Sequence, residues 1–104
     1  MKGAGLEKFE WDEAKVSQVL AKHGIDLIRA AQLFDDDHIV RPAKSDGELR
    51  YQAIGPLDGK LISLIFTYRG ENIRLITARR ARQDESRAYY NDVDGRDQSA
   101  DRQR

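Results

Sequence analysis

The 104-residue chain contains no cysteine, only two prolines and no long apolar run. The missing thiols exclude disulfides and thiolate metal sites, and they are compatible with a reducing compartment. The longest apolar stretch, residues 61–66, is interrupted by Ser63 and is too short to span a bilayer. Residues 1–11 lack the apolar core of a signal peptide, so we expect a cytoplasmic protein without a membrane span.

The sequence also lacks an excess of either charge, because 18 Lys and Arg balance 18 Asp and Glu. The balance conceals an asymmetry: residues 60–90 hold seven basic and three acidic side chains, whereas residues 1–59 hold eight and eleven. A local excess of positive charge in a neutral chain favours a confined polyanion site over general coating of nucleic acid. It also argues against a sequence-specific DNA binder that acts alone.

Apolar spacing predicts three helices within a single domain over residues 1–91. The first follows Asp12 as its cap, ends at Gly24 and has one face formed by Val16, Val19, Leu20 and His23. The second is capped by Asp26 and forms a hairpin with the first, with a stripe formed by Leu27, Ala30, Ala31 and Phe34. The third covers residues 81–91, and we expect the polar residues 92–104 to form a disordered tail.

Alternating residues predict the strands of an antiparallel sheet. We expect a short first strand at 8–11 and a strand at 38–41 that Pro42 ends. Strands at 49–55, 61–68 and 72–78 follow, with a turn at 56–59 marked by Asp58-Gly59. Helices that precede a run of strands indicate the α+β class, with the helices packed on the sheet.

Residues 72–90 combine cations with groups that can transfer protons. Three arginines, Arg79, Arg80 and Arg82, end the strand, and Glu85 and Tyr89 share a face of the helix that follows. Such a set suits phosphodiester cleavage, because negative charge builds up on the non-bridging oxygens as the bond breaks. The alternative is that the arginines are ordinary solvated charges after a strand.

Several motifs in the same order resemble the BrnT toxins, over roughly residues 8–90. They are Phe9-Glu10-Trp11-Asp12, Lys15, Lys22-His23-Gly24-Ile25, Phe34-Asp35-Asp36, Glu48-Leu49-Arg50-Tyr51 with Ile54-Gly55, Tyr68-Arg69-Gly70, and Ile73 to Ala81 with Glu85 and Tyr89. Val19 stands where this family often has asparagine, and this leaves open a toxin that has lost its activity.

The resemblance implies a RelE-like fold and the toxin of a bacterial type II toxin–antitoxin system. Such a protein would be an endoribonuclease that inhibits translation, neutralised by a BrnA-like DNA-binding antitoxin. Operator DNA would then be bound only through the antitoxin. The alternative is a catalytically inactive module that binds the antitoxin and acts as corepressor of its operon.

RNA supplies its own nucleophile, the 2′-hydroxyl, so cleavage needs only proton transfer and charge stabilisation. We therefore expect no metal and no cofactor. The two histidines, His23 and His38, lie far apart and give no metal-ligand spacing, and we interpret His38 as a surface residue.

Given the resemblance to the BrnT toxins, the candidate catalytic residues are His23, Arg50, Arg79, Arg80 and Glu85. The candidate RNA-binding residues are Lys22, Arg82 and Tyr89. An imidazole titrates near neutrality, so His23 is the candidate base or acid, unless it only packs at its helix end. Arg50 would clamp a phosphate, unless it pairs with a surface carboxylate.

Arg79 and Arg80 leave the strand in opposite directions, and alternation places Arg79 on the side of Ile73, Leu75 and Thr77. Glu85 is a candidate base or an orienting group for an arginine, unless it forms a helix-surface ion pair with Arg82. Tyr89 or Tyr90 would stack on a base, although we expect at least one of the two to pack in the core.

Overall fold

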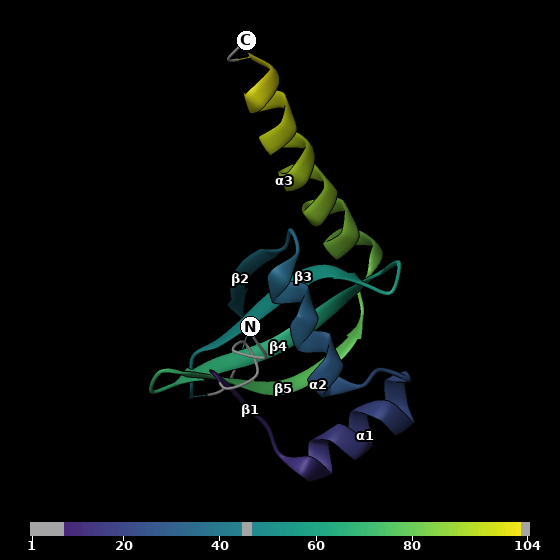
Figure 1. Ribbon diagram of the computed structural model, residues 1–104, viewed down its shortest axis with the longest axis vertical. Helices are drawn as coiled ribbons and strands as arrows, with labels where there is room; N and C mark the ends of the chain where they lie inside the picture. The colour runs from purple at the N-terminus through teal and green to yellow at the C-terminus, as the bar shows by residue number, and fades with distance from the viewer. Residues whose placement is uncertain (1–7, 45–46, 103–104) are drawn as a thin grey trace.

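The computed structural model describes residues 8–44 and 47–102 (Figure 1). It belongs to the α+β class, as predicted. In chain order the elements are β1 (Phe9–Glu10), α1 (Glu13–His23), α2 (Leu27–Ala30), the 3₁₀ helix η2 (Ala31–Asp35), β2 (Ile39–Ala43), β3 (Arg50–Leu57), β4 (Lys60–Arg69), β5 (Asn72–Arg80) and α3 (Gln83–Arg102).

The five strands form one sheet in the order β1-β5-β4-β3-β2. Strands β2 to β5 are joined by antiparallel pairings, but β1 pairs with β5 in parallel, so the sheet is mixed and our antiparallel prediction was wrong for this strand. The parallel pairing is possible because the whole intervening chain acts as the crossover connection.

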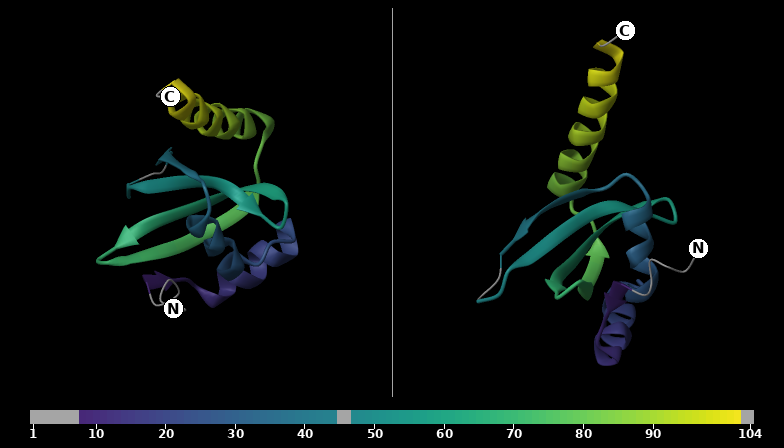
Figure 2. Two further views of the ribbon diagram at one scale, coloured as in Figure 1. Left: turned by 45° about the horizontal axis from the view of Figure 1, so that its top comes forward. Right: turned by 60° about the vertical axis from the view of Figure 1, so that its left-hand side comes forward.

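The sheet lies between two unequal helical layers (Figure 2). Helices α1, α2 and η2 cover one face, where Leu27 and Leu33 pack with Leu64 and Phe66 of β4, all four fully buried. Helix α3 starts on the opposite face and then leaves the sheet. One face of the sheet therefore forms the main core, and the other carries polar side chains together with the fully buried Ile54.

Helix α1 begins and ends as predicted, with Asp12 accepting a hydrogen bond from the Ala14 N–H and Gly24 in the left-handed conformation. Its inward face is narrower than the spacing predicts. Val19 is 4% exposed and belongs to the core, whereas Leu20 is 54% exposed. Leu20 is turned outward because only the Val19 side of the helix meets β5.

Two further elements differ from the prediction. The second helix changes after Ala30 into the 3₁₀ turn η2, although its predicted stripe of apolar residues is buried or partly buried. Pro42 lies inside β2 rather than ending it, and pairs with Tyr51. An edge strand tolerates proline, since one side of the strand needs no ladder hydrogen bonds.

Strand β3 also runs further than predicted, through Pro56 to Leu57. The turn is reduced to Asp58 and Gly59, both at positive φ (54° and 79°), as a two-residue hairpin requires.

Helix α3 continues to Arg102, although we predicted its end at Asn91 and a disordered tail beyond. The helix has no break at residue 91, and its C-terminal half projects away from the sheet (Figure 1). The segment contains no proline, so helical hydrogen bonding can continue even without an apolar stripe. The final two residues of the predicted tail, 103–104, lie outside the described residues.

A β-bulge in β5 reverses the alternation that we predicted. Phe66 of β4 pairs with Leu75, but Ile65 pairs with Thr77, so Ile76 is the extra residue. After the bulge, Ala78 joins Leu75 in the core. We predicted that Arg79 shares a face with Ile73 and Leu75, and this was wrong. Arg79 lies instead on the polar face of the sheet.

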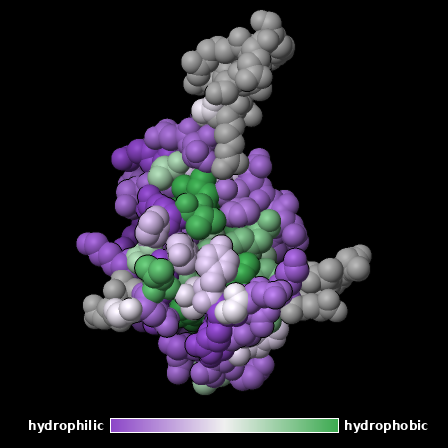
Figure 3. Space-filling model, turned by 90° about the vertical axis from the view of Figure 1, so that its left-hand side faces the viewer, coloured by the Kyte–Doolittle hydropathy of each residue, from purple (hydrophilic) through white to green (hydrophobic). Residues whose placement is uncertain are grey.

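Apolar side chains also remain exposed beyond the helical layer. Val40 of β2, Leu49 before β3 and Tyr68 of β4 are 46%, 77% and 56% exposed. Figure 3 views the molecule from the side on which β2 lies, and apolar groups gather there within a hydrophilic surround.

Gly55 is required where η2 and the loop after it approach β3. A Cβ atom at this position would lie 3.0 Å from the His38 Cβ and 3.4 Å from the Leu33 Cβ. We expect Gly55→Ala to lower the free energy of unfolding by about 1–3 kcal/mol, measured by urea denaturation. Gly95→Ala is the matched control, because its Cβ would meet nothing within 4 Å, and it should cause no loss. Equal stability of the two variants would contradict this packing.

Candidate functional site

Four arginines lie on the sheet face opposite α1 and α2, which we call the arginine face. Strand register places four side chains there: Arg41 from β2, Arg50 from β3, and Arg74 and Arg79 from β5. Arg74 pairs with Thr67, whose hydroxyl donates to the carbonyl of Leu49, the residue before Arg50, and Arg41 pairs with Gln52. The structure therefore brings two predicted residues, Arg50 and Arg79, onto the same surface and adds two others.

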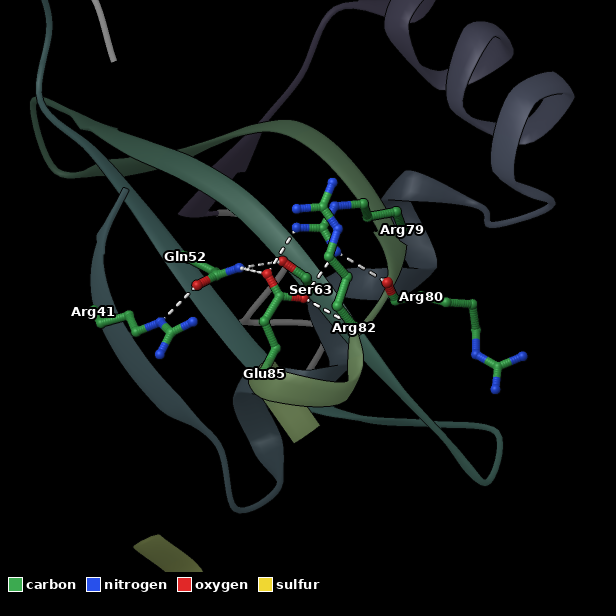
Figure 4. A network of polar contacts seen from close by, with 7 residues as sticks. All are labelled: Arg41, Gln52, Ser63, Arg79, Arg80, Arg82 and Glu85. Atoms are coloured by element: carbon green, nitrogen blue, oxygen red, sulfur yellow. Dashed lines mark hydrogen bonds and ion pairs between the residues drawn. The ribbon is translucent and has the colours of Figure 1, made fainter. Parts of the chain in front are cut away.

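The guanidinium of Arg79 is held by the carboxylate of Glu85 in a two-point contact (Figure 4). Nη1 donates to Oε1 and Nη2 donates to Oε2, both at 2.8 Å. Nη1 also donates to the carbonyl of Arg80 at 3.1 Å. Within the described residues, the Nε–H and the second Nη2 hydrogen of Arg79 have no acceptor, so this edge of the guanidinium can still bind an anion.

The carboxylate of Glu85 is at the centre of a buried network. The Gln52 amide nitrogen donates to Glu85 Oε2 and to Ser63 Oγ, each at 2.8 Å, and the Gln52 oxygen accepts from Arg41 Nε at 2.7 Å. Gln52, Ser63 and Glu85 are 7%, 0% and 5% exposed. Because every member has a partner, the network can be buried without an orphaned polar group.

Glu85 also fixes the start of α3. It is the third residue of the helix, and its Oε1 accepts a hydrogen bond from the backbone N–H of Arg82 at 2.8 Å. This is one half of a capping box. Our alternative of a helix-surface ion pair with Arg82 is therefore wrong, since the side chain of Glu85 pairs with Arg79 instead.

These contacts keep Glu85 ionised. Its hydrogen bonds with Arg79, followed by those from the Arg82 N–H and Gln52, lower the pKa of Glu85 to about 2, although burial acts in the opposite direction. The same carboxylate raises the pKa of Arg79. A carboxylate with so low a pKa is a poor proton acceptor near neutrality. The geometry favours the second predicted role of Glu85, orienting an arginine.

Arg50 and Arg74 line a cavity of about 220 Å³ together with Arg69 and Lys15. The Arg50 Nε donates to Glu48 at 3.2 Å, the surface pairing that we had kept as an alternative. The cavity also contains Asp12 and Glu48, and Glu10 pairs with both Arg69 and Arg74, so the four cations exceed the three nearby carboxylates by one. Positive charge therefore continues along the sheet beyond Arg79.

His23 and Arg80 lie away from Arg79. The bulge directs Arg80 to the α1 and α2 side, and its side chain points away from the network in Figure 4. His23 and Arg80 line a cavity of about 310 Å³ with Lys60. A second cavity, of about 140 Å³, contains His23, Lys22 and Thr77. Because Thr77 pairs with Ile65 on the arginine face, His23 lies at the β5 edge between the two faces.

The two tyrosines divide as we expected. Tyr89 is 7% exposed, and its hydroxyl donates to the carbonyl of Asp37 at 3.1 Å, so it packs between α3 and the loop before β2. Tyr90 is 54% exposed and makes an edge contact with the ring of Tyr89. Of the two, Tyr90 offers its ring to solvent, which differs from our choice of Tyr89 for RNA binding.

A family model of the ribonuclease toxin BrnT, of type II toxin–antitoxin systems, matches residues 11–85. The chain belongs to the BrnT family. The match includes the arginine face and ends at Glu85. A search of curated proteins gave no match. Membership in the BrnT family implies a ribonuclease with an RNA target and an antitoxin as partner.

Sequence reasoning missed Arg41, Gln52, Ser63 and Arg74 as members of this candidate site. Arg41 and Gln52 become visible once β2 and β3 are aligned, since they pair directly. Within the described residues, no cluster of three or more potential metal ligands occurs, and no helix has the length and apolarity needed to cross a membrane.

The Glu85 network predicts a dependence of stability on pH. In the unfolded chain a glutamate titrates near 4.3. With the folded pKa lowered to about 2, the stabilisation is complete above the unfolded pKa of about 4.3 and is lost as the pH falls towards 2. We expect Glu85→Gln to lower the unfolding free energy at pH 7 by about 3 kcal/mol.

The gap between wild type and Glu85→Gln should shrink as the pH is lowered from about 4.5 to 2. Urea denaturation at several pH values measures it. Glu71→Gln is the control, because Glu71 is exposed and should change little at any pH. Parallel stability curves for wild type and Glu85→Gln would show that the pKa of Glu85 is not lowered by folding.

Proposed function

We propose that this BrnT protein is a metal-independent endoribonuclease that binds the RNA backbone on its arginine face. The observation that carries the proposal is the orientation of Arg79, whose guanidinium is fixed by a buried carboxylate while one edge stays available. A pre-oriented guanidinium is suited to the charge that develops on a phosphate in the transition state. Arg50 and Arg74 extend the positive surface for neighbouring phosphates.

The reaction would use the 2′-hydroxyl of the substrate. This oxygen attacks the adjacent phosphorus and loses its proton, the bond to the 5′-oxygen breaks, and that oxygen takes up a proton. The products are a 2′,3′-cyclic phosphate and a 5′-hydroxyl end. His23 is the proposed proton-transfer group, since it lies at the β5 edge in a cavity shared with Thr77. Glu85 acts as a positioning residue for Arg79.

We also propose that the fold is RelE-like, that the cleaved RNA is needed for translation, and that the protein acts in the cytoplasm, where translation takes place. A BrnA-like antitoxin neutralises it and supplies the contact with operator DNA. The antitoxin-binding, catalytically inactive module remains the second candidate, and the exposed side chains of Val40, Leu49 and Tyr68 fit either function because both need a protein partner.

The first test is RNA cleavage by purified protein in excess chelator. We expect 5′-hydroxyl and 2′,3′-cyclic phosphate ends, detected by end-group analysis. The double variant Arg79→Met, Glu85→Gln removes both charges together and so leaves no buried orphan ion. It should cut at least about 100-fold more slowly, the effect of losing one transition-state donor. Arg87→Ala, an exposed arginine on α3, is the control.

Circular dichroism and an unfolding curve establish that the double variant is folded. Cleavage by this folded variant at the wild-type rate would exclude Arg79 from the reaction. Intact RNA with the wild-type protein, together with tight antitoxin binding, would select the inactive module instead.

The role of His23 has its own test. We expect His23→Gln to lower kcat by roughly 100-fold, the contribution of general acid–base catalysis. It should also remove the limb of the pH–rate profile that reports an imidazole. Gln18→Ala is the control, because Gln18 is an exposed residue of α1 that lines the same cavity and has no acid–base group. An unchanged pH profile in His23→Gln would assign proton transfer to another group.

A further inference from the structure

Arg41 is oriented by an amide rather than by a carboxylate. Its Nε donates to the oxygen of Gln52 at 2.7 Å. The amide nitrogen of Gln52 donates both of its hydrogens, one to Ser63 and one to Glu85, so the Gln52 oxygen must face β2. The side chain of Arg41 is thereby drawn over the arginine face instead of extending freely into solvent, as Figure 4 shows.

The positive charge of Arg41 is not neutralised locally. On the arginine face, Arg50 pairs with Glu48, Arg74 with Glu10, and Arg79 with Glu85. Among the side chains that the structure describes, in residues 8–44 and 47–95, no carboxylate forms an ion pair with Arg41, and its two terminal nitrogens have no acceptor. A guanidinium that is fixed through Nε keeps four N–H groups for a ligand.

Arg41 and Arg79 are linked by a continuous set of hydrogen bonds. Gln52 joins Arg41 to Glu85, and Glu85 joins the amide to Arg79, with successive donor–acceptor distances of 2.7, 2.8 and 2.8 Å. The four residues come from β2, β3, α3 and β5. Two guanidinium groups are therefore oriented on one surface by a shared, buried support.

We propose that Arg41 is a second fixed phosphate ligand, which binds the RNA backbone beside the phosphate held by Arg79. This inference rests on the proposed function, because it assumes that RNA lies on the arginine face. The ligand class is single-stranded RNA, whose successive phosphates present one negative charge each. Arg41 adds affinity and register rather than transition-state stabilisation, since it is separate from the reacting phosphate.

The experiment measures binding of a fluorescent 2′-O-methyl oligoribonucleotide, which cannot be cleaved because its nucleophile is blocked. We expect Arg41→Ala to weaken binding by about five- to tenfold at low salt. The slope of log affinity against log salt should become less negative by about 0.7, the value for one phosphate contact on a single strand. Arg41→Lys, which keeps the charge but loses the fork, should retain the slope and recover part of the affinity.

A structural role would give a different result. If Arg41 only attaches the edge strand β2 to β3, Arg41→Ala lowers the unfolding midpoint and leaves the salt slope unchanged. Arg87→Ala is the control for a general loss of positive charge. With cleavable RNA, Arg41→Ala should raise KM and leave kcat within about twofold, as expected for uniform binding.

The two proposals fail in different ways. If the wild-type protein does not bind the oligonucleotide, the proposed function fails and the inference fails with it. If the wild type binds and the Arg79 and Glu85 double variant binds more weakly, but Arg41→Ala has the wild-type affinity and slope, only the role of Arg41 is overturned.

Discussion

The ion pair between Arg79 and Glu85 links the end of the sheet to the helix that follows it. One carboxylate, 5% exposed, holds a guanidinium from β5, accepts a backbone N–H at the start of α3 and accepts an amide hydrogen from β3. A buried pair of this kind adds little stability compared with apolar packing, but it costs several kcal/mol if one partner is lost. Its main consequence is positional, because it determines where α3 begins and how Arg79 is oriented.

The bulge at Ile76 determines which surface this ion pair occupies. Without the extra residue, strict alternation would place Arg79 on the core side with Leu75, and Arg80 on the polar side. The observed register reverses the two, so that Ala78 fills the core and Arg79 meets Ser63 on the opposite face. The unpaired residue Ile76 therefore determines that Arg79, and not Arg80, lies on the arginine face. Bulges near functional sites commonly redirect a side chain in this way.

Local features of the fold could be predicted from the sequence. Caps and turns depend on neighbouring residues, so Asp12, Gly24 and Asp58-Gly59 were predicted correctly. The bulge depends on how β4 pairs with β5 and leaves no local pattern, so the face of Arg79 was predicted wrongly.

The partners in the network were hidden for a similar reason. Glu85 is 33 positions from Gln52, and Gln52 is 11 from Arg41, so neither contact follows from periodicity along one element. Composition alone would assign all of them to an exposed, charged surface. Sequence reasoning could therefore identify the cations and the carboxylate but could not specify which of them share a surface.

This arrangement reconciles two requirements that conflict in a small protein. A polyanion site needs uncompensated positive charge, whereas a thin core cannot tolerate charges that repel one another at close range. Arg41 supplies the uncompensated positive charge, because it is hydrogen-bonded to a neutral amide. The buried carboxylate of Glu85 neutralises Arg79 and so limits repulsion between the cations. The buried Gln52 side chain makes both possible, because an amide can accept from one arginine and donate to the carboxylate that holds the other. A carboxylate at position 52 could accept from Arg41 but could not donate to Glu85, and an apolar residue could do neither.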